Sequence, residues 1–472
     1  MLITSTLLLA LAALALPHSA QTISPRQSSK ATIQKATAAT AAGDVESAAD
    51  YVSAIAAQPK DAALRVAYAN FLLGQRRYAE SIAQSQEALK LSPHRLDAEI
   101  ALATAYRGVH NYDQTKLVLE AAHREHPADA QPLAALGDLE IELQMYDMAI
   151  THLRAALAIR PGDVPTRERL LIAYKAKGDS ADAIAQASAI LAREPKNALA
   201  YFTRAQIYSD RNQDVLARKD AERAVSLQPH NPRARALLGK IMLRAPEQET
   251  PAEAEQRCAH ATAILDPLAA DPTNPPDSDS LFLLARAYQC AGDDAKAEQY
   301  NAAFEKSSKN DRTEKENQTQ AKHLVQQANE LAQQNDFDGS LKLLEQAIDL
   351  DPISGAAYSQ LAKLYYSAGK IDEAADAVAK AIERDPNQPD YLYVRGKIFE
   401  KQNELDEALA DFRRTTEIDP NESDAYFEMG QIYQQQGDRS AALDAFENAA
   451  RISPDDPDYK RALAALRSAT SQ

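Results

Sequence analysis

Residues 425–454 read AYFEMGQIYQQQGDRSAALDAFENAARISP, and this stretch decides the fold. Apolar residues recur at helical spacing up to Tyr433, a short polar break contains Gly437 and Asp438, and a second periodic run ends at Pro454. Proline cannot continue a helix, because it lacks a backbone N–H and its ring clashes with the preceding turn. The stretch therefore predicts two amphipathic helices joined by a tight turn.

The proline that closes this stretch belongs to a series. Prolines recur 34 residues apart in two sets, which are Pro59, Pro93, Pro127, Pro161, Pro195 and Pro229, and then Pro352, Pro386, Pro420 and Pro454. Two residues after many of them stands Asp, Asn or Ser, whose side chains accept hydrogen bonds from the unpaired N–H groups that begin a helix. A fixed period of this length predicts helical hairpins that stack on their neighbours.

The quoted copy also carries a family signature at the right spacing. Its signature residues are Tyr426, Met429, Gly430, Tyr433, Ala442, Phe446, Ala449 and Pro454. The pattern resembles the tetratricopeptide repeat (TPR), and the resemblance covers nearly all of residues 28–470 with about twelve copies. It implies an all-α fold, a right-handed α-solenoid superhelix of helix-turn-helix repeats. It also implies that the first helix of each hairpin lines a concave face that binds peptides or partner helices.

Composition and charge narrow the function classes. The 472 residues include only 14 Gly and no Trp, and the formal net charge is −16. Nucleic-acid affinity comes largely from Lys and Arg that neutralise phosphates, so this charge disfavours RNA or DNA as a partner. No stretch is long and apolar enough to predict a transmembrane span.

The N-terminus predicts export. Ten apolar residues from Leu7 to Leu16 suit the hydrophobic region of a secretory signal, with Ala20 as a cleavage residue. The first Lys or Arg comes after this run, which is atypical of such signals. We expect residues 1–20 to be a signal peptide and the mature protein to be periplasmic or secreted.

The strict period fails in the middle of the chain, which suggests a division into parts. The expected parts are a first array over 28–277 with an insertion near 244–253, an irregular repeat and long polar helix over 278–320, a regular array over 321–456, and a C-terminal capping helix over 457–472. The polar segment that begins KSSKNDRTEKENQTQ suits either a flexible linker or, because its residues favour helix, a long exposed helix.

Both cysteines lie in this irregular part. Cys258 is expected near the start of a second helix and Cys290 near the end of the following first helix. Adjacent antiparallel helices bring such ends together, so an oxidising compartment would permit a disulfide. Two buried free thiols are the alternative.

No catalytic motif is present. The chain lacks a Gly-rich phosphate loop, a metal-type Cys pair and a G-x-S-x-G sequence. His123 and His126 lie three residues apart on one helix face, but a third ligand is not evident, so an ordinary exposed helix end is the simpler explanation. We therefore predict a protein that is not an enzyme and has no catalytic residue, cofactor or metal. An enzyme or metal-binding protein with an unrecognised site on the solenoid is the alternative.

Projection of the repeat register places one basic group on the concave face. Arg233, Lys240 and Arg244 fall on one stripe of a single helix, Arg286 falls on the next first helix, and Phe202 and Phe282 flank them. A second set projects the same way: Lys363, Tyr366, Tyr393, Lys397 and Phe427. A basic stripe with aromatic edges suits an acidic peptide or a terminal carboxylate. A solvated helix face without a partner is the alternative.

These observations predict a non-enzymatic scaffold for protein–protein interaction. Its partners would be proteins or peptides, including acidic ones, held in the concave groove. The sequence sets neither the partner's identity nor the oligomeric state.

Overall fold

The computed structural model describes residues 46–246, 248–270 and 275–468, and every regular element in these ranges is a helix. The predicted signal peptide and the start of the expected first array, residues 28–45, lie outside the described residues. The first elements are α2 (Glu46–Ala57), α3 (Ala62–Gly74), α4 (Tyr78–Leu91), α5 (Leu96–Gly108), α6 (Tyr112–Glu125), α7 (Gln131–Glu142), α8 (Tyr146–Ile159), α9 (Val164–Lys177), α10 (Ser180–Arg193), α11 (Ala198–Asp210) and α12 (Asp214–Leu227).

The irregular part and the second array complete the chain. The elements are α13 (Pro232–Met242), α14 (Pro251–Leu265), the 3₁₀ helix η1 (Asp266–Leu268), α15 (Ser278–Cys290), α16 (Asp294–Gln333), α17 (Phe337–Leu350), α18 (Gly355–Ser367), α19 (Ile371–Arg384), α20 (Pro389–Gln402), α21 (Leu405–Ile418), α22 (Ser423–Gln436), α23 (Arg439–Ile452) and α24 (Pro457–Ser468). Consecutive helices pack as antiparallel hairpins, so the predicted all-α solenoid is confirmed.

The hairpin α22–α23 shows how the signature residues work. Gly430 allows close approach, because a Cβ at this position would lie 2.6 Å from the ring of Phe446. Phe446 and Ala442 are fully buried. Tyr433 is only partly buried, and its hydroxyl accepts a hydrogen bond of 2.7 Å from Arg413. The small and large residues of the signature therefore fit one another across the hairpin.

The break inside every described hairpin except the irregular α13–α14 pair contains one residue shown in the left-handed backbone region. These residues recur with the repeat and are Arg76, His110, Gln144, Gly178 and Asn212, and later Gly292, Asn335, Gly369, Asn403 and Gly437. Only glycine takes this conformation without steric cost, so the arginine, histidine and glutamine at this position are held there by the two flanking helices.

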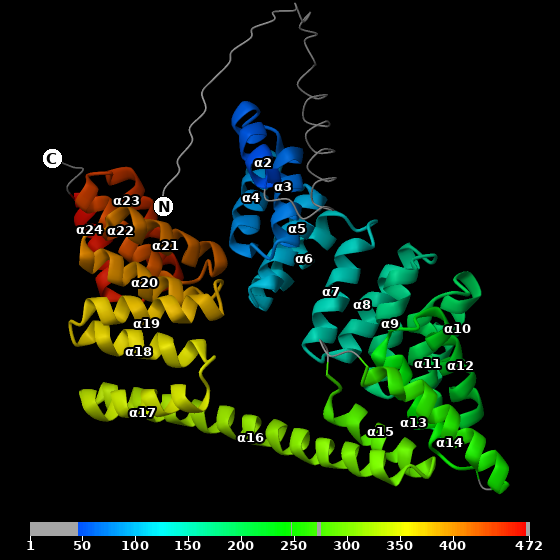
Figure 1. The fold of residues 1–472 in the computed structure, drawn as a ribbon. Coiled ribbons are helices and arrows are strands. Elements are labelled where there is room, and N and C mark those ends of the chain that lie inside the picture. The colour runs from blue at the N-terminus through cyan, green and yellow to red at the C-terminus, as the bar shows by residue number, and fades with distance from the viewer. Residues whose placement is uncertain (1–45, 247, 271–274, 469–472) are drawn as a thin grey trace, which may run out of the picture.

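Two parts of the superhelix that are far apart in the sequence meet. Helix α4 packs against α21, and Ala79, Leu392 and Ile418 form one buried cluster across the contact. The side-chain amide of Asn111 donates a hydrogen bond of 3.0 Å to the backbone carbonyl of Ile418. The described repeats therefore close into a ring, as Figure 1 shows for α4–α6 beside α20 and α21.

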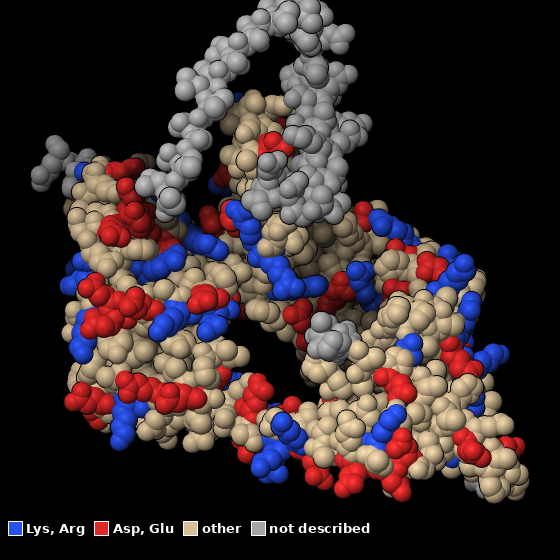
Figure 2. All heavy atoms as spheres, viewed as in Figure 1, with Lys and Arg blue, Asp and Glu red and all other residues tan. Residues whose placement is uncertain are grey.

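Helix α16 joins the two arrays as a single element of 40 residues. Its first part packs against α15, its last part packs against α17 and α18, and its middle is exposed. Figure 2 shows acidic and basic side chains interspersed over this face and an opening near the middle of the molecule. No helix in the described part of the chain combines the length and apolar character needed to cross a bilayer.

Candidate functional site

A pocket of about 910 Å³ lies between the first helices of three successive hairpins, α11, α13 and α15. Phe202 and Gln206 contribute from α11, and the other lining residues include Arg233 and Lys240 from α13. Phe282 and Arg286 contribute from α15, while Pro275, Pro276 and Asp277 close the side between η1 and α15. The volume is typical of sites that bind small molecules or short peptide segments.

The repeat register explains why these side chains face the pocket. Ala234, Leu238 and Ile241 bury the apolar face of α13. Arg233 and Lys240 lie seven residues apart, two helical turns, and both are exposed on another face. Neither has an ion-pair partner among the described residues. Two cations of the pocket are therefore uncompensated.

Aromatic rings form the edges of the same pocket. The side chain of Phe282 is 41% exposed and lies against Phe304, with ring centroids 5.4 Å apart. The guanidinium of Arg286 lies 5.8 Å from the centroid of the Phe282 ring, within the range of a cation–π contact. Two carboxylates are also present: Asp277 caps α15 by accepting 2.8 Å from the Ser280 N–H, and Asp279 lines the wall.

Arg244 does not join this group. Its guanidinium donates to the carbonyl of Ser209 at 2.9 Å and to a carboxylate oxygen of Asp214 at 2.8 Å. These bonds tie the end of α13 to the turn between α11 and α12. The structure therefore brings together five residues of the expected first group, namely Phe202, Arg233, Lys240, Phe282 and Arg286.

The second expected group is internally neutralised. The Lys363 ammonium lies 2.5 Å from a carboxylate oxygen of Asp390. Lys397 lies 2.6 Å from Glu400 and 2.8 Å from Glu428. Burial raises the pKa of the Glu428 carboxyl, and Lys397 opposes that rise. Both lysines therefore already have carboxylate partners within the chain.

The aromatic members of the second group also have intramolecular contacts. Tyr366 packs against the buried cluster of α18, α19 and α20. Tyr393 lies 5.6 Å from Phe412 by ring centroids, and burial raises the pKa of its phenol. Phe427 contacts the rings of Phe446 at 5.6 Å and Tyr459 of the terminal helix α24 at 4.9 Å. These three rings therefore pack against other side chains of the solenoid.

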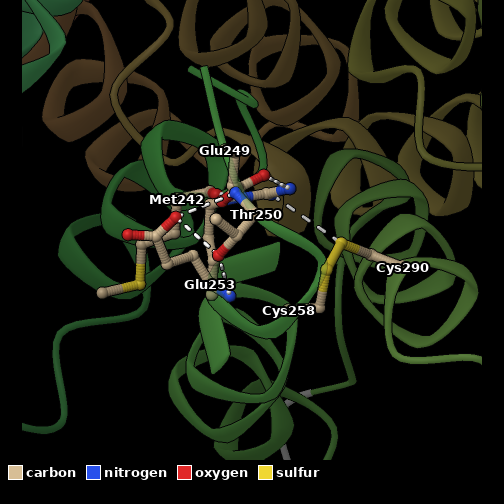
Figure 3. A network of polar contacts seen from close by, with 7 residues as sticks. Met242, Glu249, Thr250, Glu253, Cys258 and Cys290 are labelled. Carbon is tan, nitrogen blue, oxygen red and sulfur yellow. Dashed lines mark hydrogen bonds and ion pairs between the residues drawn. A yellow bond between two sulfur atoms is a disulfide. The ribbon is translucent and has the colours of Figure 1, made fainter. Parts of the chain in front are cut away.

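The irregular hairpin beside the pocket is held by a network that Figure 3 shows. Arg257 pairs with Glu249 at 2.7 Å and donates to the carbonyl of Met242 at 3.1 Å, which fixes the insertion to α14. Thr250 and Glu253 form a capping box at the start of α14. The insertion is therefore anchored at both ends.

The structure joins Cys258 to Cys290 in a disulfide, with Cα atoms 5.3 Å apart. Cys258 lies in the middle of α14, not near its start, because α14 begins only at Pro251, after the insertion. Cys290 ends α15. The bond fixes α15, which carries Phe282 and Arg286, against α14.

Sequence reasoning missed several lining residues. Arg235 lines the pocket but donates to the carbonyl of Pro229 at 2.6 Å and to that of Ile264 at 3.0 Å. Arg65 and Arg167 make the equivalent bond to the prolines six residues before them. Arginine recurring in register with the prolines was the available signal. Gln206, His230 and the Pro275–Pro276 pair gave no comparable signal.

Comparison with known proteins agrees with the fold. Sequence profiles described as tetratricopeptide repeat match residues 33–95, 130–163, 169–232, 331–398 and 396–467. Together the matches cover more than half of the chain. The chain belongs to the tetratricopeptide repeat family, whose repeats mediate protein interactions.

Three solved structures illustrate the similarity. "YrrB: a TPR protein with an unusual peptide-binding site" is 21% identical, with a TM-score of 0.33 over 39% of this chain and 95% of its own. A tetratricopeptide repeat protein from Parabacteroides merdae ATCC 43184 is 19% identical, with a TM-score of 0.41 over 55% and 99%. MamA protein is 19% identical, with a TM-score of 0.29 over 32% and 83%. No curated protein matches the sequence significantly.

Proposed function

We propose that the protein is a non-enzymatic scaffold that binds an acidic, aromatic-containing peptide segment in the pocket between α11, α13 and α15. The observation that carries the proposal is the pair of uncompensated cations, Arg233 and Lys240, between the rings of Phe202 and Phe282. A carboxylate-bearing segment would pair with these cations, and an apolar side chain would cover the Phe282 ring.

Charge also favours an acidic segment over other ligands. The chain as a whole is strongly acidic, so it repels most polyanions at long range. A short acidic segment is instead attracted locally where the positive groups gather. Asp277 and Asp279 at one side of the pocket would orient it, because they repel its carboxylates towards α13.

We also propose that the protein acts outside the cytoplasm, in the cell envelope or secreted. The apolar N-terminal run supports export, and the Cys258–Cys290 bond suits an oxidising compartment. Thiol labelling of protein isolated without reductant tests this location. Two labelled thiols would count against it.

Peptide binding can be tested by fluorescence anisotropy. The probe is a short labelled peptide of alternating Glu and Phe, compared with its Lys and Phe counterpart. We expect the acidic peptide to bind and the basic one not to bind. Changing Arg233, Lys240 and Arg286 together to Glu should weaken binding by at least about tenfold, which corresponds to about 1.4 kcal/mol.

The matched control reverses three exposed cations of α12. Arg218, Lys219 and Arg223 are exposed on this second helix, so their change to Glu alters the net charge equally. We expect the control to retain affinity apart from a small long-range effect that salt screens. Equal loss in both triple variants, or no binding by wild type, would remove the pocket from the proposal.

A further inference from the structure

Three polar side chains, His94, Glu99 and Glu125, converge at the joint between two successive hairpins, far along the chain from the pocket, and His126 lies beside one of them, Glu99. His94 lies in the turn between α4 and α5, Glu99 lies in α5, and Glu125 and His126 end α6. The Nδ1 atom of His94 contacts a carboxylate oxygen of Glu125. Single ligand atoms of His94, Glu99 and Glu125 all lie within 4.8 Å of one another.

Two of the converging atoms have no hydrogen bond. The Nε2 atom of His126 lies 3.4 Å from Oε2 of Glu99, yet neither atom has a hydrogen-bond partner. The Glu99 side chain is only 9% exposed, so an unpaired oxygen there is unfavourable. Tetrahedral zinc, with bonds of about 2.0–2.1 Å, holds its ligand atoms about 3.3 Å apart. The facing pair therefore has the spacing of two ligands on one ion.

The carboxylates of this cluster favour a bound cation. Glu99 and Glu125 together carry two negative charges when ionised, and neutral imidazoles add none. A dication would balance both carboxylates and offset the cost of burying Glu99.

The backbone at His94 is exceptional for this fold. Its φ is +60°, a conformation that costs energy for a residue with a Cβ. Every other described residue with such a φ lies in the break inside a hairpin. His94 alone among them lies between two hairpins, and this conformation accompanies the contact of its ring with Glu125.

We propose that His94, Glu99, Glu125 and His126 bind one divalent transition-metal ion. Two imidazole nitrogens and two carboxylate oxygens form a ligand set that zinc accepts in tetrahedral geometry. The sequence prediction of no metal rested on the absence of a third ligand beside His123 and His126. The fold supplies further candidates from the preceding joint, and one of them, Glu99, faces His126.

The ion would act as a staple between neighbouring hairpins. It would hold the turn before α5 against the end of α6, where no covalent link exists. The Cys258–Cys290 bond does the same for α14 and α15. Metal binding would therefore stabilise the folded chain by mass action.

The test is zinc binding by the untagged full-length protein after dialysis against a chelator. Titration of Zn²⁺ in competition with a chromophoric chelator should give one tight site per chain. Glu99→Gln and His126→Gln should each weaken binding by about 100-fold or more, because each removes a ligand. Co²⁺ should give the visible absorption of a tetrahedral site in wild type and lose it in both variants.

Two matched controls separate this site from other histidines. His110→Gln changes an exposed histidine that bonds Tyr112, and His123→Gln changes the histidine one turn before His126. Both should bind Zn²⁺ as wild type does. If Glu99→Gln or His126→Gln does not fold, His94→Gln replaces it, because that side chain is exposed in a turn.

Three outcomes would overturn the proposal. The first is a wild type that binds Zn²⁺ no more tightly than the ligand variants, which would leave only a network of ion pairs. The second is full affinity in His94→Gln. The third is loss of binding in His123→Gln with retention in Glu99→Gln, which would assign the metal to a different pair. Peptide binding at α11, α13 and α15 is measured separately and does not depend on these results.

Discussion

The pocket between α11, α13 and α15 and the regular array from α18 to α23 are built from the same hairpin, but they treat inward-facing cations differently. In the regular array, Lys363 meets Asp390 and Lys397 meets Glu428, each from the following first helix. In the pocket, Arg233 and Lys240 meet no carboxylate within ion-pair distance among the described residues.

The difference follows from spacing. A strict period brings each first helix to the same place on its predecessor, and carboxylates there neutralise the lysines. Around α14 the chain adds a loop before the helix and η1 after it, so α15 follows later than the strict period would place it, and it presents Phe282 and Arg286 instead. The regular array thus pairs its two inward-facing lysines within the chain, whereas the interruption leaves Arg233 and Lys240 available to a partner.

The largest expected contrast is between two phenylalanines. Phe446→Ala should lower the free energy of unfolding by about 3–5 kcal/mol, because a fully buried ring against Gly430 leaves a cavity. Phe282→Ala should cost less, about 1 kcal/mol, since that ring is 41% exposed and its loss opens onto solvent rather than leaving an enclosed cavity. Denaturant titrations followed by circular dichroism compare them. Similar losses would mean that Phe282 is structural.

Reduction of the disulfide should affect one region alone. Its closed loop spans a separation of 32 residues, for which a cost of about 2–4 kcal/mol is expected on reduction. Hydrogen exchange should accelerate in α14 and α15 and stay constant in α20–α23. The Cys258→Ser/Cys290→Ser variant serves as the control and should no longer respond to reductant. Uniform acceleration would show that the two regions unfold as one unit.

Replacing a paired and an unpaired lysine by methionine tests whether the two regions differ in how they use their cations. Lys397→Met leaves Glu428, whose side chain is 12% exposed, without its cation and should cost about 1–3 kcal/mol. Lys240→Met should change stability by no more than about 0.5 kcal/mol. Thermal melts in parallel measure both. A destabilised Lys240→Met would indicate that Lys240 has a structural contact.

The smallest effect concerns the junction where the regular array meets α4. Burial raises the pKa of the Glu417 carboxyl to about 7, Arg414 and Arg413 lower it, and Glu80 of α4 raises it. The closed ring therefore favours protonated Glu417. Its contribution is fully present below the ordinary pKa of about 4.5 and is lost as pH rises through about 7.

X-ray scattering between pH 5 and pH 8 measures this effect on ring closure. We expect the radius of gyration to increase with pH in wild type. Glu417→Gln, which cannot ionise, should remain compact over the same range. Parallel pH profiles in the two proteins would assign the change to other groups.

The sequence predicts the hairpins because their determinants are local. A proline follows the second helix in each regular repeat, and Gly430 of the quoted stretch meets the Phe446 ring. The disulfide was one of two alternatives, and its geometry needed the fold. Arg244 and Lys397 show the limit of projection. A helical register predicts the direction in which a side chain points. It does not predict the ion-pair partner at that place, which is Asp214 for Arg244 and Glu428 for Lys397.

The ring closure and the metal-type cluster were beyond sequence reasoning for the same reason. Asn111 and Ile418 are separated by 307 residues, and no local pattern links them. The cluster offered a weak signal, since His94 follows one proline of the series and His126 precedes the next. Stacking of successive hairpins brings such residues together, which the sequence positions alone do not show.

Helix α16 sets how the second array is rotated relative to the first about the helix axis. At 3.6 residues per turn, one extra residue in its exposed middle would rotate everything after it by about 100° and carry α21 away from α4. A loop can accommodate inserted residues locally. Helix α16 is part of two hairpins, so each residue inserted into it would rotate the whole second array. The length of α16 therefore fixes the orientation of the second array. Only insertions of about eighteen residues, five complete turns, would leave that orientation unchanged.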